Sequence, residues 1–163
     1  MCINSVEANH TVRKNMEDHE VYAAIGRIVV AFNSVEHWLA RLLASKLGLK
    51  GDAYCDALSA SMSFGQKLDL LCALEKEDAK LDLKERDRRI KVLHAAKKLE
   101  ERRNAIVHSA YGIFSEGGSA LQRRKAQTRG LKGLHVKIDS LDPVELREIE
   151  EKLLSWMLDY LDV

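Results

Sequence analysis

The sequence contains few of the residues that break helices or cross-link a chain. Proline occurs once, aromatic residues make up only 6%, and the three cysteines (Cys2, Cys55 and Cys72) are far apart. An odd number of cysteines without a C-x-x-C pair predicts neither a disulfide framework nor a thiolate zinc site, and it indicates a reducing compartment. With 46% hydrophobic and 31% charged residues, the composition favours long amphipathic helices over short strands. The predicted fold class is all-α.

Long apolar runs are also missing. No run reaches the roughly 20 residues that cross a bilayer as a helix. The first ten residues, MCINSVEANH, lack the apolar core of a signal peptide. We therefore expect a cytoplasmic protein with no membrane partner. The 163 residues fit one domain, 1–163, which is long enough to form a core without a metal or disulfide.

Charge is unevenly distributed along the chain. The net charge is +1, but residues 82–110 carry +4 and 111–138 carry +5, whereas 1–81 carry −2 and 139–163 carry −6. Basic patches attract polyanions such as nucleic acid. A solvated basic face beside acidic neighbours gives the same pattern, and charge alone favours this second interpretation.

Hydrophobic spacing predicts two helices in the first half of the chain. After a loose segment, 1–16, apolar residues recur at helical spacing over 21–47 and predict a long first helix. Residues 63–66 read Ser-Phe-Gly-Gln, which has the form of a capping box and opens an amphipathic run over 67–74. Residues 52–61 add a short helix before it.

The second half predicts two further helices separated by a basic excursion. The third helix runs from Leu83 to about Ala110, with its arginines and lysines facing outward. Residues 112–140 contain glycines, a basic cluster and an alternating segment, 134–138, that indicates a hairpin strand in an exposed loop. Asp142-Pro143 supplies an N-cap and a first-turn proline for the last helix.

Several catalytic site types are not indicated. A di-metal carboxylate site in a helical bundle needs paired Glu-x-x-His motifs, and only Glu7 to His10 has that spacing. Zinc-protease, P-loop, dinucleotide and G-x-S-x-G patterns are missing as well. We expect neither a metal nor an organic cofactor.

The remaining candidate site lies near the end of the third helix. Arg103, Asn104 and His108 place a permanent cation, an amide and an imidazole within about one and a half turns. Asn104 and His108 are four residues apart and share a face, so Asn104 is placed to orient the ring. Arg103 is roughly 140° around an ideal helix from His108, and the two converge only at a distorted helix end or across a dimer interface.

The segment Arg103-Asn104-x-x-x-His108 resembles the Arg-x4–6-His motif of the HEPN superfamily, in which a polar residue often follows the arginine. Phe32-Asn33-x-x-Glu36 in the first helix and Ser63-Phe64-Gly65-Gln66-Lys67 in the second extend the similarity over most of the chain. The family comprises helical bundles, many of them metal-independent endoribonucleases of toxin–antitoxin, phage-defence and CRISPR systems. Together with the helices and the basic excursion indicated by the sequence pattern, the resemblance predicts an all-α HEPN-like bundle of four main helices with a basic loop or β-hairpin insertion before the last.

The resemblance also implies a reaction and partners. RNA would be cleaved by its own 2′-hydroxyl to give a 2′,3′-cyclic phosphate, with His108 as general base or acid, a role that contributes about 10²–10⁴-fold in rate. Arg103 would bind the phosphate through a bidentate fork. A homodimer would bring two motifs into one cleft, and a toxin would have an antitoxin protein as a further partner.

Two other positions and a basic loop complete the prediction. Glu36 interrupts the apolar stripe of the first helix, and its cationic partner is either Arg103, which it would orient, or Lys67 in a structural ion pair; the structural interpretation is favoured. Tyr111 is a candidate base contact. The residues predicted to bind the RNA backbone are Arg123, Arg124, Lys125, Arg129 and Lys132.

Two other functions fit the same residues. A non-catalytic HEPN-like module would use the cleft to hold RNA, a nucleotide or a partner protein. A helical dimerisation scaffold would need no ligand at all.

Overall fold

The computed structural model describes residues 5–114, 121–128 and 134–161, which form a mostly helical protein, as the composition predicts. The helices are α1 (Ser5–Lys46), α2 (Asp52–Ser61), α3 (Phe64–Glu77), α4 (Leu83–Val107) and α5 (Pro143–Leu161). Before α5, strands β1 (Ala110–Gly112), β2 (Gln122–Thr128) and β3 (Leu134–Ser140) form an antiparallel sheet in the order β1-β2-β3. No helix among the described residues is long and apolar enough to span a membrane.

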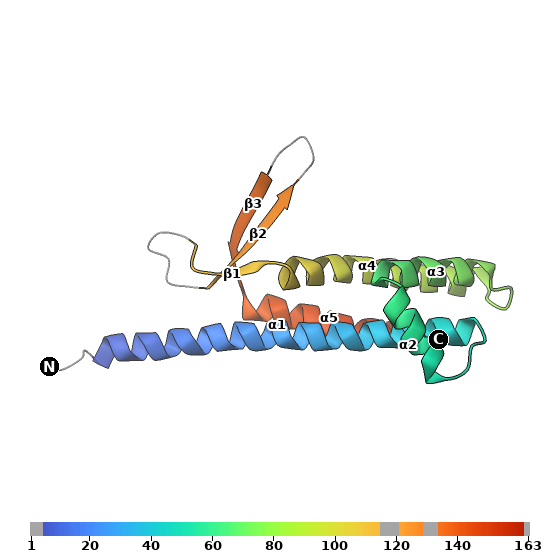
Figure 1. Ribbon diagram of the computed structural model, residues 1–163, viewed down its shortest axis with the longest axis horizontal. Helices are drawn as coiled ribbons and strands as arrows, with labels where there is room; N and C mark the ends of the chain where they lie inside the picture. Colours follow the sequence, from blue (N-terminus) through green and yellow to red (C-terminus); the bar gives the residue numbers. More distant parts are fainter. Residues whose placement is uncertain (1–4, 115–120, 129–133, 162–163) are drawn as a thin grey trace.

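Helix α1 is longer than its hydrophobic pattern predicts. It begins at Ser5, so the backbone of residues 5–16 is helical, which corrects the predicted loose segment. No glycine or proline occurs between Ser5 and Gly26, so no residue in this stretch stops the helix. The first turns of α1 extend past the other helices (Figure 1).

The core lies between α1 and the three other long helices. Helix α5 runs parallel to α1, because Arg27 pairs with Glu150 and Trp38 contacts both Trp156 and Tyr160 further along. Figure 1 shows α1 and α5 together below α3 and α4. Helix α1 contributes four side chains to the core that are at most 1% exposed: Ile28, Val35, Leu39 and Leu43. The apolar spacing of α5 predicts six inward residues, of which Met157 is partly buried and the other five are buried: Leu146, Ile149, Leu153, Trp156 and Tyr160.

The predicted capping box at the start of α3 is present. The Ser63 hydroxyl accepts a hydrogen bond from the Gln66 amide at 3.3 Å, and the Gln66 side chain accepts one from the Ser63 amide at 2.8 Å. These two bonds satisfy donors that the first turn of a helix otherwise leaves open. They fix the place where α3 begins beside α1 and α4.

Substitution Ser63→Ala is expected to lower the free energy of unfolding by about 1 kcal/mol, because one N-terminal amide of α3 loses its acceptor. Urea denaturation followed by circular dichroism measures this change. Ser61→Ala, at the end of α2, is the matched control. An equal loss in both variants would show that the capping box does not stabilise the fold.

Helix α4 ends three residues earlier than predicted. Val107 is its last residue and His108 is the C-cap, with φ −101° and ψ 31°. Ala110 instead starts β1, where it lies opposite Arg124 of β2. Pairing with β2 therefore holds Ala110 in an extended conformation, and the helix ends before it.

The excursion before α5 contains the predicted strand and a partner for it. Strands β2 and β3 pair antiparallel from Gln122↔Ser140 to Thr128↔Leu134, and the hairpin projects away from the helices (Figure 1). The predicted N-cap of α5 is also present, since the Asp142 carboxylate accepts a hydrogen bond from the Val144 amide at 2.8 Å.

Candidate active site at the end of helix α4

Arg103 faces the bundle rather than solvent, which corrects the prediction that the arginines of α4 point outward. It lies four residues after Leu99 and three before Ile106, on the same stripe of the helix. Its guanidinium carbon is 4.6 Å from the centre of the Phe32 ring of α1, a cation–π contact that contributes up to about 2 kcal/mol where it is desolvated. Its Nε is buried and has no hydrogen-bond partner among the described residues.

The Asn104 side chain contacts Arg103 and not the His108 ring. The Arg103 Nη1 donates to Asn104 Oδ1 at 2.9 Å. Within the described part of the chain, no hydrogen bond joins Asn104 to the His108 ring, so the predicted orientation of the imidazole by Asn104 does not occur in this state. The His108 side chain is exposed at the C-cap, on another side of the helix end from Arg103.

An ionic cluster beside Arg103 joins α1, α3 and α4. Lys67 is completely buried, and its ammonium donates to Glu36 at 2.8 Å and to the Ser59 carbonyl at 3.2 Å. The partner of Glu36 is thus Lys67, as the structural interpretation predicts. Burial and the nearby charge of Glu36 raise the pKa of Glu100, while Arg103 acts in the opposite direction.

Tyr111 is held against the end of α4. Its hydroxyl donates to the carbonyl of Ile106, inside the motif, and its side chain is partly buried. Burial raises the pKa of this phenol. The hydroxyl therefore fixes β1 to α4, and only the ring remains for the predicted contact with a base.

The predicted RNA-binding cations differ in their surroundings. Arg123 donates two hydrogen bonds to Asp139, at 3.0 and 2.6 Å, which lower the pKa of that carboxyl to about 2. Arg124 is exposed and lies 5.8 Å from the centre of the Phe114 ring, and Lys125 is partly buried on β2. Two further predicted cations, Arg129 and Lys132, lie outside the described residues.

A hollow of about 350 Å³ lies between the end of α4, the hairpin and the start of α5, and Arg103, Asn104 and His108 are not among the residues that line it. Ala105 and Ile106, between Arg103 and His108 in sequence, line it together with Leu146 and Ile149 of α5. Three cations and two anions also line it: Arg102, Arg123, Lys137, Asp139 and Glu145. The size is at the lower end of small-ligand sites.

A second buried ionic cluster, which the sequence analysis missed, lies at the other end of the bundle. Glu75 of α3 is completely buried, with Lys46 at 2.8 Å and Arg89 at 3.6 Å. It accepts a hydrogen bond from the Tyr160 hydroxyl, and burial of the phenol together with this bond raises the pKa of Tyr160 well above its usual value. The sequence signal was a carboxylate four residues after Leu71 on the apolar stripe. The cluster joins four helices, and its member on α4, Arg89, precedes Arg103 by fourteen residues, or about 21 Å along the helix.

Among the described residues, no group of three or more His, Cys, Asp and Glu side chains could hold a metal ion. Cys55 is buried as a core residue, and burial raises the pKa of the Cys72 thiol. Comparisons of the chain with protein-family models, curated proteins and solved structures found no match.

Proposed function

We propose that the protein is a metal-independent endoribonuclease of the HEPN type, with Arg103 and His108 as its catalytic residues and RNA as its substrate. The observation that carries this proposal is the inward-facing position of the Arg103 guanidinium and the missing acceptor for its buried Nε among the described residues. A guanidinium at a core-facing position is stacked on Phe32 and keeps a buried Nε without an acceptor. Buried donors without an acceptor are rare in folded proteins. Arg86 Nε is the other such donor among the described residues, and only Arg103 lies in the motif, where a bound anion would supply an acceptor.

The reaction needs only groups present in the chain. His108 is exposed, so its imidazole is free to take the proton of the RNA 2′-hydroxyl or to protonate the 5′-oxygen that leaves. Arg103 stabilises the charge on the phosphorus oxygens. The products are a 2′,3′-cyclic phosphate and a 5′-hydroxyl, and a toxin or phage-defence role fits such an activity.

A homodimer is part of this proposal. Arg103 points into the bundle and His108 to solvent, so one chain does not direct both groups at one phosphate in the described state. A second copy would supply the complementary residue. Arg124 and Lys125 on β2, near the hollow at the end of α4, would contact the backbone of the RNA on either side of the cleaved bond.

A non-catalytic RNA-binding module is the second candidate, and one observation favours it. The His108 ring makes no hydrogen bond or ion pair with other described residues, whereas catalytic histidines are usually oriented by a neighbouring acceptor. A binding module would use the same hollow and the same cations without proton transfer.

Cleavage of a mixed RNA pool in excess EDTA tests the proposal. We expect wild type to produce cyclic-phosphate ends and His108→Ala to be about 10²–10⁴-fold slower. His94→Ala is the matched control, because Arg89 and His94 have the same spacing in mid-helix and His94 is also exposed. RNA that is bound but not cut by wild type would establish the binding module instead.

A further inference from the structure

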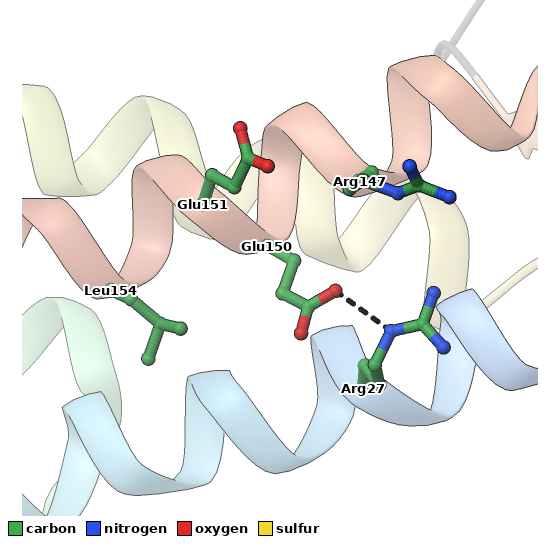
Figure 2. A pocket seen from close by; sticks show the side chains of 5 residues that line it. All are labelled: Arg27, Arg147, Glu150, Glu151 and Leu154. Atoms are coloured by element: carbon green, nitrogen blue, oxygen red, sulfur yellow. Dashed lines mark hydrogen bonds and ion pairs between the residues drawn. The ribbon is translucent and has the colours of Figure 1, made fainter.

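Two hollows lie beside α5, and they differ in the residues that line them. The first, of about 390 Å³, lies between α1 and α5 and is drawn in Figure 2. Arg27 and Glu150 pair across it at 2.9 Å. Of the other described residues that line it, Arg147 and Glu151 are charged and Leu154 alone is apolar. So little apolar surface gives the flat ring of a ligand nothing to pack on.

The second hollow, of about 350 Å³ beside the hairpin, has an apolar floor. Ile106 of α4 and Leu146 and Ile149 of α5 line it, and each is at most 4% exposed, so the core holds these side chains in place. Ala105 and Leu141 also line it. Small-ligand sites are mostly apolar surfaces with a few polar groups that fix the orientation of the ligand. We call this site the hairpin hollow, and its floor suits one flat ring.

Paired and unpaired charges surround this floor. Arg123 of β2 lies opposite Asp139 of β3 and donates to it at 3.0 and 2.6 Å, and Lys137 pairs with the same carboxylate at 2.9 Å. Glu145 of α5 and Arg102 of α4 are exposed and have no ion-pair partner among the described residues. The bond to Asp139 raises the pKa of Arg123 most, and the charge of Glu145 acts in the same direction, which places Glu145 near that pair. Glu145 and Arg102 are therefore available to a ligand.

The edges of the four RNA bases offer different groups to a carboxylate and a guanidinium. Guanine has two adjacent donors, N1–H and the N2 amino group, which one carboxylate accepts with its two oxygens. It also has two adjacent acceptors, O6 and N7, which one guanidinium fork contacts. Adenine directs an acceptor, N1, at the carboxylate, and cytosine and uracil each offer it one donor group. Guanine therefore matches Glu145 and Arg102 best.

Other ligands fit the charges of the hairpin hollow less well. A phosphate would meet the carboxylates of Asp139 and Glu145, which both line it. A lysine or arginine side chain of a protein would meet its three cations. A neutral ring with donors on one edge and acceptors on the next meets neither difficulty. The hairpin hollow thus suits a base more than a phosphate or a basic peptide.

We propose that the hairpin hollow binds one guanine base of single-stranded RNA, with the Glu145 carboxylate accepting from N1 and N2 and the Arg102 guanidinium donating to O6 and N7. Single-stranded RNA exposes these edges, because its bases are unpaired. Ile106 on the floor precedes His108 by two residues, so the bound guanosine lies beside the cleaved bond and selects it. This selection rests on the proposed ribonuclease activity, whereas the binding of guanine does not.

Binding of short labelled RNAs to the full chain, followed by fluorescence anisotropy, tests the proposal. The RNAs are 2′-O-methylated uridine hexamers with a single guanine, inosine or adenine, and they lack the 2′-hydroxyl through which RNA would be cut. Inosine differs from guanosine only in the missing N2 amino group. We expect the guanine RNA to bind about tenfold or more tightly than the inosine and adenine RNAs, because each of these leaves a carboxylate oxygen without its donor.

Glu145→Gln and Glu151→Gln are the matched pair of variants. Each removes one negative charge from α5, but Glu145 lines the hairpin hollow and Glu151 lines the hollow of Figure 2. Glu145→Gln should lose the preference for guanine over inosine, and Glu151→Gln should keep it. Far-UV circular dichroism verifies that both variants retain their helices. Equal affinities of wild type for the three RNAs, no measurable binding, or an unchanged preference in Glu145→Gln would overturn the proposal.

Cleavage of unmodified RNA is scored separately, so that the two proposals can fail independently. A guanine preference in binding without any cut RNA would refute the ribonuclease and support the guanine site. Cut RNA together with equal binding of the guanine, inosine and adenine hexamers would support the ribonuclease and overturn the guanine site.

Discussion

Replacing Lys67 with alanine is expected to lower the free energy of unfolding by about 3–5 kcal/mol, one of the two largest effects that the structure predicts. Lys67 is 0% exposed and donates to Glu36 and to the Ser59 carbonyl. Alanine removes both hydrogen bonds and leaves a cavity where the four-carbon stem was. It also leaves the Glu36 carboxylate, which lies near Glu100, without the Lys67 ammonium that pairs with it.

Lys67→Met separates the two contributions to this loss. Methionine keeps most of the stem volume and removes the charge, so we expect a smaller loss of about 1–3 kcal/mol from the unpartnered oxygens of Glu36 and Ser59. The double variant Lys67→Met, Glu36→Met should regain part of it, because a buried ion pair can often be replaced by apolar residues of similar volume. Urea midpoints measure all three variants. A loss below about 1 kcal/mol in Lys67→Ala would show that the pair is not a stabilising contact.

The helices were predictable because their signals are local. The capping box of Ser63 and Gln66, the N-cap Asp142 and the alternation of Leu134, Val136 and Ile138 each specify a backbone conformation within a few residues. The start of α1 was missed because residues 5–16 lack a clear apolar stripe. The end of α4 was missed because Ala110 is held by a strand, β2, that follows it in the sequence by more than ten residues.

The burial of charged residues inside the bundle was the part of the site that the sequence did not predict. Arg103, Lys67 and Glu75 all occupy inward positions of their helices, but a charged side chain in an apolar stripe predicts burial only if its partner is known. Those partners come from other helices, and no spacing within one helix identifies them. The sequence did indicate the two candidates for Glu36, and the structure selects Lys67.

Replacing Arg103 with lysine is expected to slow RNA cleavage by about 10²–10³-fold, the loss seen when one transition-state donor is removed. Lysine keeps the positive charge but lacks the planar fork that binds two phosphate oxygens and stacks on Phe32. If Arg103 acts on the transition state, kcat should fall while KM changes little. This prediction rests on the proposed ribonuclease activity.

Arg102→Lys is the matched control for Arg103→Lys. Arg102 is the preceding residue, it is exposed at the rim of the hollow, and it lies away from Phe32, so its replacement should affect RNA affinity and salt dependence more than kcat. Unfolding curves of both variants exclude a loss of fold as the cause. A kcat in Arg103→Lys equal to that of wild type would make Arg103 a structural residue held by Phe32 and Asn104. The phosphate-binding role would then pass to the cations of the hairpin.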